Sequence, residues 1–198
     1  MLNVDQNLQY GIRAKTVCAS CQSILHLFDD TNIDIDEFEK YCGEGVYGYD
    51  IEHSGLVLIP LVLDENGDVV EKPGSHMGFV HNRGTTFDRF SVASSLRPWF
   101  GSGKFGNDKR NVFMGFLATA SAGTVSILPD YMGYGGSQAW RAYMVRNAYV
   151  TATLPLWLKV SSDLKKETDC KAALANAAFL GGYSEGGKGN FLFFEFVS

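Results

Sequence analysis

The stretch that most constrains how this chain can fold is Gly182-Tyr183-Ser184-Glu185-Gly186, which has the pattern Gly-x-Ser-x-Gly. The apolar run 177–183 leads into it and predicts a strand that ends in a tight turn. Glycines two positions either side of Ser184 let backbones pass closely, and a serine on such a strand-to-helix turn stands above the sheet. The pattern therefore predicts that Ser184 is a nucleophile.

The residue after the serine has a predicted role of its own. The backbone N–H of Glu185 would point at the oxygen that becomes negative when an acyl carbonyl is attacked. A helix that begins here would add its positive dipole end. The alternative is a glycine-rich loop with an incidental serine, because the chain has 22 glycines and the motif is only a hypothesis without its structural context. The pattern alone leaves both interpretations open.

The overall composition is that of one globular domain and excludes several classes of partner. At 198 residues, 45% of them hydrophobic and 20% charged, the chain is long enough to bury a core. Its net charge of −5 argues against nucleic acid and anionic membrane surfaces as partners. No apolar run reaches the ~20 residues of a membrane span, and the N-terminus lacks the basic flank and apolar core of a signal peptide. The sequence predicts no transmembrane segment and leaves the compartment unassigned.

The first half of the chain is predicted to be a helix followed by strands. Residues 5–28 carry a mixed apolar stripe that predicts a helix. The acidic segment 29–42 fails the spacing rule of a calcium-binding loop, so we interpret it as a solvated helix start and predict no metal site. Strands are predicted over 55–63 and 77–81, and Asn66-Gly67 between two β-rich runs indicates a hairpin.

The second half alternates strands with helices. We predict a helix over 112–122, a strand over 123–128, and a further helix that Ser137 caps and Pro155 kinks or ends. This alternation is typical of a parallel sheet. Residues 101–106 formally match a dinucleotide fingerprint, but they follow no buried strand and open no apolar helix, so no cofactor is predicted.

Three stretches in a fixed order carry a further signal. Residues 81–94 read His-Asn-Arg-Gly-Thr-Thr-Phe-Asp-Arg-Phe-Ser-Val-Ala-Ser, residues 125–135 contain Pro-Asp-Tyr-Met-Gly-Tyr-Gly, and residues 182–187 read Gly-Tyr-Ser-Glu-Gly-Gly. Together they resemble the α/β-hydrolase superfamily, and more closely its secretory lipase and esterase-like branch. That branch has a His-Gly-Thr loop followed by Arg and Val-Pro-Ser, then a Pro-Asp-Tyr-x-Gly-x-Gly crossing, then a Gly-Tyr-Ser-Gln-Gly-Gly turn.

The resemblance implies an α/β fold, with a mostly parallel sheet and flanking helices over residues 45–198. The apolar stripe noted above predicts that residues 1–44 form an N-terminal helical segment. The resemblance also implies a serine hydrolase that acts on small-molecule or lipid esters without a cofactor, and it suggests secretion. It further implies that the N–H groups of Glu185 and Thr85 bind the oxyanion. We expect the Thr85 loop to approach Ser184, because it would follow a strand two places away in the sheet.

The chain also departs from the family pattern. Arg83 stands where the family has a histidine before the glycine. In this fold the catalytic acid and histidine follow the serine, but all four histidines precede it: His26, His53, His76 and His81. The resemblance therefore implies a partial α/β-hydrolase fold, truncated after the helix that follows the serine. Two hypotheses remain, a serine hydrolase with Ser184 as nucleophile, or a catalytically inactive chain of the same fold, either truncated or a non-catalytic binding relic.

Overall fold

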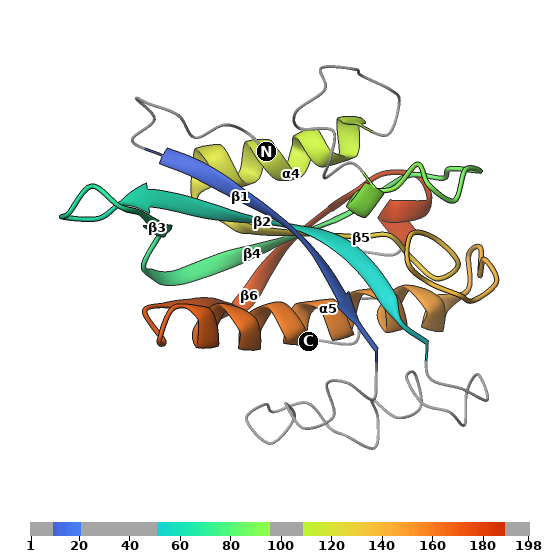
Figure 1. The fold of residues 1–198 in the computed structure, drawn as a ribbon. Helices are drawn as coiled ribbons and strands as arrows, with labels where there is room; N and C mark the ends of the chain where they lie inside the picture. The colour runs from blue at the N-terminus through green and yellow to red at the C-terminus, as the bar shows by residue number, and fades with distance from the viewer. Residues whose placement is uncertain (1–9, 21–50, 96–108, 189–198) are drawn as a thin grey trace.

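The computed structural model describes residues 10–20, 51–95 and 109–188 and shows a sheet with a long helix on each face (Figure 1). Its elements, in chain order, are β1 Tyr10–Ala19, β2 His53–Leu63, β3 Val69–Glu71, β4 Gly74–Asn82, α4 Lys109–Ala122, β5 Val125–Pro129, α5 Arg146–Glu167 and β6 Ala172–Gly182. α4 covers one face of the sheet and α5 covers the other. The α/β class predicted from the sequence is confirmed.

The strand order shows where a site can form. The sheet has six strands in the order β1-β2-β5-β4-β6, with β3 paired to β2. β4 runs parallel to β5 and β6, whereas β2 runs antiparallel to β1, β3 and β5, so the sheet is mixed rather than mostly parallel. The chain leaves β4 to form β5 on one side and then β6 on the other. The carboxyl end of β4 is therefore a switch point, where open α/β sheets bind ligands.

Residues 10–19 form a strand, so the predicted N-terminal helix is wrong there. β1 pairs with β2 along its whole length. Its apolar side chains change face along the strand, because Ile12 and Ala14 pack in the cluster beneath α4 whereas Val17 and Ala19 pack in the cluster beneath α5. This change of face produces a spacing that imitates a helical stripe. β1 belongs to the sheet, and most of the remaining N-terminal segment lies outside the described residues.

Two apolar clusters hold the sheet between its helices. Neighbouring residues of β2 join different clusters, since Leu56 packs with Val112 of α4 whereas Val57 shares a cluster with Leu154 of α5. All of residues 53–61 are buried. A strand covered on both faces has a continuous apolar sequence, which explains why the strand predicted here is confirmed.

α5 begins later and runs further than the predicted helix. It spans Arg146–Glu167, has no side-chain N-cap, and contains Pro155 in its interior. A proline inside a helix costs about 3 kcal/mol. Leu154 and Leu156 beside it are fully buried, and burying each such side chain contributes roughly 1.5–3 kcal/mol, so packing against the sheet outweighs the break. Ser137, the predicted cap, lies instead in the segment that precedes the helix.

The hairpin predicted at Asn66-Gly67 is present between β2 and β3. The Gly67 N–H donates to the Asp64 carbonyl at 3.0 Å, and Gly67 has a φ of +83°. We expect Gly67→Ala to lower the free energy of unfolding by about 1 kcal/mol, measured by urea denaturation. No atom lies within 4 Å of the added methyl group, so the cost is backbone strain alone. Gly67→Asn, which tolerates this conformation better, is the control; an alanine variant as stable as the wild type would contradict the expectation.

Candidate active site

Ser184 lies in the turn that joins β6 to a short helical segment. β6 ends at Gly182, helical residues begin at Glu185, and Ser184 between them has a φ of +55°. This conformation costs a non-glycine residue about 1–2 kcal/mol, and such strain persists where the surroundings over-determine it, often at functional sites. Ser184 is exposed. The strand-to-helix turn predicted from the Gly-x-Ser-x-Gly pattern is therefore present.

Gly186 brings this turn into contact with the loop after β4. A Cβ atom at Gly186 would lie 2.0 Å from the carbonyl oxygen of Asn82. No side chain fits in that space, so the two backbones touch only because this residue is glycine. Gly84, in the same loop, also lies close to the turn, because a Cβ atom there would lie 2.6 Å from the ring of Tyr183. The loop after β4 therefore packs against residues on both sides of the serine.

This loop approaches the serine from the adjacent strand, whereas the sequence led us to expect a strand two places away. Asn82 at the end of β4 lies opposite Gly182 at the end of β6 in a parallel ladder. Thr85 comes three residues after Asn82, so it lies near the carboxyl ends of β4 and β6, as Ser184 does. The proximity of the loop is as expected, and the oxyanion role of the Thr85 N–H stays a prediction.

Arg83 is buried at the base of this loop, where the resembling branch has a histidine. Its Nη1 donates to the Gly84 carbonyl at 2.9 Å and its Nη2 donates to the Asp130 carbonyl at 3.2 Å. The guanidinium carbon lies 4.8 Å from the ring centre of Tyr131 and 4.3 Å from that of Tyr134. Arg83 therefore links the loop after β4 to the segment after β5.

Asp130 anchors that segment from a fully buried position. Its Oδ2 accepts hydrogen bonds from the Ser54 hydroxyl at 2.6 Å and from the Ser94 hydroxyl, and its Oδ1 accepts from the Ser94 N–H at 3.0 Å. Burial raises the pKa of the Asp130 carboxyl, although these hydrogen bonds and the Arg83 charge act against the rise. The sequence marks Asp130 as part of a motif but gives no sign of Ser54, which comes from β2.

The Glu185 side chain is buried and hydrogen-bonded, a feature that the sequence did not predict. One carboxylate oxygen accepts from the Tyr149 hydroxyl at 2.9 Å, and the other lies 3.4 Å from Nη2 of Arg141. Burial, and then the bond to Glu185, raise the pKa of Tyr149 well above its usual value, so the phenol stays a donor. These partners are 36 and 44 residues from Glu185 in the chain, which is why no local pattern reveals them.

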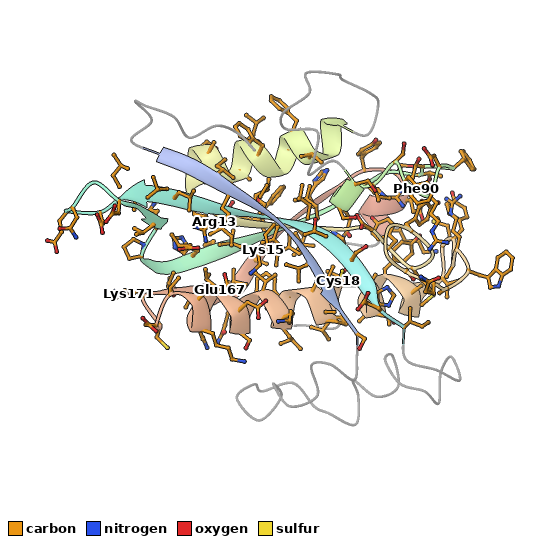
Figure 2. All side chains as sticks on the ribbon, in the orientation of Figure 1. Arg13, Lys15, Cys18, Phe90, Glu167 and Lys171 are labelled. Atoms are coloured by element: carbon orange, nitrogen blue, oxygen red, sulfur yellow. The ribbon has the colours of Figure 1, made fainter. Side chains whose placement is uncertain are left out.

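Exposed aromatic residues gather at this end of the molecule. Figure 2 shows Phe90, in the loop after β4, at the opposite end from Lys171, which directly precedes β6. Ser184 follows the far end of β6 and so lies at the Phe90 end. Arg141 connects the segments here, with its guanidinium 5.3 Å from the ring centre of Phe87 and 4.7 Å from that of Tyr143. The exposed aromatic residues of these segments are Phe87, Phe90, Trp140, Tyr143 and Tyr183.

The described histidines lie in strands. His76, near the start of β4, has both ring nitrogens within hydrogen-bond distance of backbone carbonyls, at 3.1 and 2.6 Å. His53 is fully buried at the start of β2, three strands from β6. His81 is buried near the end of β4 with its ring stacked on Phe79. His26 lies outside the described residues, and the contacts named here assign no histidine as the general base.

The described residues include no group of three or more His, Cys, Asp or Glu side chains that could hold a metal ion. Within the same residues, no helix is both long and apolar enough to cross a membrane. The glycine-rich stretch 101–106 and the acidic segment 29–42 lie outside the described part of the chain.

Comparisons with known proteins support the fold. No family profile and no curated protein matches the chain. Among solved structures, it is similar to the rice cell wall degrading esterase LipA from Xanthomonas oryzae, with a TM-score of 0.56 and 17% identity over 96% of this chain and 38% of that one. A point mutant of LipA gives a TM-score of 0.58 and 18% identity over 95% and 38%. The chain thus spans less than two fifths of these structures.

Sequence identity this low carries information about the fold alone. In the mixed sheet, the strands β5, β4 and β6 run parallel to one another. Ser184 follows β6, which lies beside the switch point at the end of β4. The similarity to LipA extends over nearly the whole of this chain. The chain therefore has an α/β-hydrolase-like fold.

Proposed function

We propose that this chain carries the nucleophile and the oxyanion-binding groups of a serine hydrolase that acts on esters. The observation that carries the proposal is the φ of +55° at Ser184, between a parallel strand and a helix and against the loop after β4. This arrangement presents a hydroxyl above the end of a sheet. A small-molecule or lipid ester is the proposed substrate class, because LipA is an esterase and exposed aromatic side chains beside the turn offer an apolar surface to an acyl chain.

In the proposed reaction, Ser184 Oγ attacks the ester carbonyl carbon while a general base takes its proton. The carbonyl oxygen becomes negative and accepts hydrogen bonds from the N–H groups of Glu185 and Thr85. The intermediate then collapses, the protonated alcohol leaves, and water hydrolyses the acyl-serine. Glu185 is the first helical residue after the serine, so its N–H has no carbonyl partner within the helix.

The general base and its acid partner are not assigned to residues of this chain. A serine hydroxyl is a weak nucleophile until an adjacent base activates it, so a direct test of Ser184 should not depend on the identity of that base. A thiol at the same position needs no base at neutral pH, because thiolate forms there spontaneously. Ser184→Cys therefore tests the site whichever residue serves as the general base.

The proposed nucleophile is tested by the reactivity of Ser184→Cys. The helix start and the N–H groups around the turn should stabilise a thiolate, so we expect the introduced thiol to have a pKa below the ~8.5 of free cysteine. The pH dependence of iodoacetamide alkylation, followed peptide by peptide, measures this pKa. We also expect a burst of about one p-nitrophenol per chain from p-nitrophenyl acetate, as the thiol is acylated.

The matched control is Ser121→Cys. Ser121 is an exposed serine in the last turn of α4, where the helix dipole has the opposite sign and disfavours a thiolate. We expect this thiol to have a pKa at or above ~8.5 and to give no burst. An ordinary pKa and no burst at position 184 would refute the nucleophile proposal and favour the non-catalytic alternative.

A further inference from the structure

The peptide bond between Gly84 and Thr85 is held through its carbonyl oxygen. Arg83 Nη1 donates to the Gly84 oxygen at 2.9 Å, and Arg83 is only 3% exposed. A trans peptide group is planar, with its N–H pointing away from its C=O, and no cis peptide bond occurs among the described residues. Fixing the Gly84 carbonyl therefore also fixes the direction of the Thr85 N–H.

The Arg83 guanidinium has little freedom to move. Its Nη2 donates to the Asp130 carbonyl at 3.2 Å, and the rings of Tyr131 and Tyr134 lie 4.8 and 4.3 Å from its central carbon. Arginine is suited to this place because its planar fork can serve two carbonyls and stack on aromatic rings at once. A lysine ammonium is compact and cannot stack in this way.

The neighbouring carbonyls of the loop are held as well. The Tyr131 hydroxyl donates to the Arg83 carbonyl at 3.0 Å, and the Tyr134 hydroxyl donates to the Thr86 carbonyl at 2.6 Å. Burial raises the pKa of both tyrosines, so both stay protonated donors at neutral pH. The backbone on each side of Thr85 is thus tied to the segment after β5, and the Arg83 guanidinium holds the peptide group that contains the Thr85 N–H.

We propose that Arg83 is a positioning residue that orients the Thr85 N–H toward the oxyanion at Ser184. This inference rests on the function proposed above, in which that N–H stabilises the negative oxygen. Arg83 touches neither the substrate nor Ser184 in this role. It acts by holding the opposite end of the same peptide group, so that the donor is already directed before the substrate arrives.

The orientation of the Thr85 N–H can be measured without any activity. In ¹⁵N relaxation of the full 198-residue protein, we expect a rigid Thr85 amide with an order parameter of about 0.85. In Arg83→Met the order parameter should fall below about 0.6, because the hydrogen bond from Arg83 to the Gly84 carbonyl is lost. Arg89→Met is the matched control, since Arg89 binds the Ser137 carbonyl instead, and it should leave the Thr85 amide rigid.

Either outcome of this measurement decides the inference. A folded Arg83→Met protein with a rigid Thr85 amide would overturn it, and so would a loss of order in Arg89→Met as large as that in Arg83→Met. If Arg83→Met does not fold, Arg83→Lys replaces it. The lysine keeps the charge but lacks the planar fork that reaches two carbonyls while it stacks on aromatic rings, so the Thr85 order parameter should lie below the wild-type value; an unchanged value would overturn the inference.

A second readout links the orientation to catalysis and separates the two proposals. In the Ser184→Cys background, Arg83→Met should slow acylation by p-nitrophenyl acetate at least about tenfold, because an oxyanion donor is misdirected. The pKa of the introduced thiol should stay below that of free cysteine, since Arg83 approaches the helical segment after the serine through its backbone oxygen, which the substitution leaves in place. If Ser184→Cys has an ordinary thiol pKa and gives no burst, the proposed function alone is refuted. If Arg83→Met disorders the Thr85 amide but leaves acylation unchanged, the role of Arg83 in the reaction is refuted.

Discussion

Gly186→Ala is expected to lower the free energy of unfolding by about 3 kcal/mol, at the upper end of the cost of overpacking. The added methyl carbon would lie 2.0 Å from the Asn82 oxygen, 2.5 Å from the Asn82 carbonyl carbon and 2.6 Å from the Arg83 oxygen. All three are backbone atoms, so no side-chain rotation can relieve the clash. The turn and the loop after β4 must move apart, and the midpoint of urea denaturation should fall accordingly.

Gly187→Ala is the matched control for this prediction. It lies one residue further along the same helical segment, where the nearest atom to an added Cβ is the Gly182 oxygen at 4.0 Å, an ordinary contact. We expect a change within about 0.5 kcal/mol, as for other surface substitutions. Equal stability of the two alanine variants would show that the turn does not pack against the loop after β4. In the Ser184→Cys background, Gly186→Ala should also abolish the acylation burst.

Asp130→Ala is expected to lower the free energy of unfolding by about 3 kcal/mol at neutral pH. The substitution removes the acceptor for the Ser54 and Ser94 hydroxyls and for the Ser94 N–H. A buried donor left without a partner costs about 1–3 kcal/mol. Urea denaturation with an unchanged m-value measures the loss.

The cost of Asp130→Ala should also depend on pH. Because burial raises the pKa of Asp130 in the folded protein, the native state binds this proton more tightly than the unfolded chain, whose carboxyl has a pKa of about 3.9. The contribution of this proton to stability is complete below pH ~3.9 and is lost as the pH rises through the raised folded pKa.

The free energy of unfolding of the wild type should therefore fall as the pH rises through the folded pKa of Asp130. Asp130→Ala lacks this carboxyl and should not show that fall. The difference between wild type and Asp130→Ala is expected to shrink as the pH rises from about 4 to 8. Asp163→Ala is the control, since Asp163 is a half-buried carboxylate paired with Lys159 within α5. A difference that grows with pH would mean that the partners of Asp130 lower its pKa more than burial raises it.

The local sequence was enough to predict elements whose surroundings stay the same along their whole length. β2 is covered on both faces and reads as a continuous apolar run, while the hairpin after it requires the left-handed conformation that Gly67 adopts easily. The turn at Ser184 was likewise predictable, because small residues around a serine have few other reasons to occur after an apolar strand.

Elements whose environment changes along their length could not be predicted in this way. The apolar side chains of β1 lie under α4 in its first half and under α5 in its second half, so their spacing mimics a helical period. α5 contains Pro155, which locally ends a helix, but packing of Leu154 and Leu156 in the core keeps it continuous. In both cases the deciding contacts come from distant parts of the chain.

The features of the candidate site also fall into those set by the local sequence and those set by contacts between distant residues. The sequence by itself determined the strand-to-helix turn at Ser184 and the order of the three motifs, because these depend on backbone geometry that glycine and neighbouring residues impose locally. Only the tertiary structure decided that β4 lies directly beside β6, that Arg83 holds the Gly84 carbonyl, and that the Glu185 side chain is buried against Tyr149. Those features are hydrogen bonds and contacts between residues tens of positions apart, and a buried polar group finds such partners only when the chain has folded.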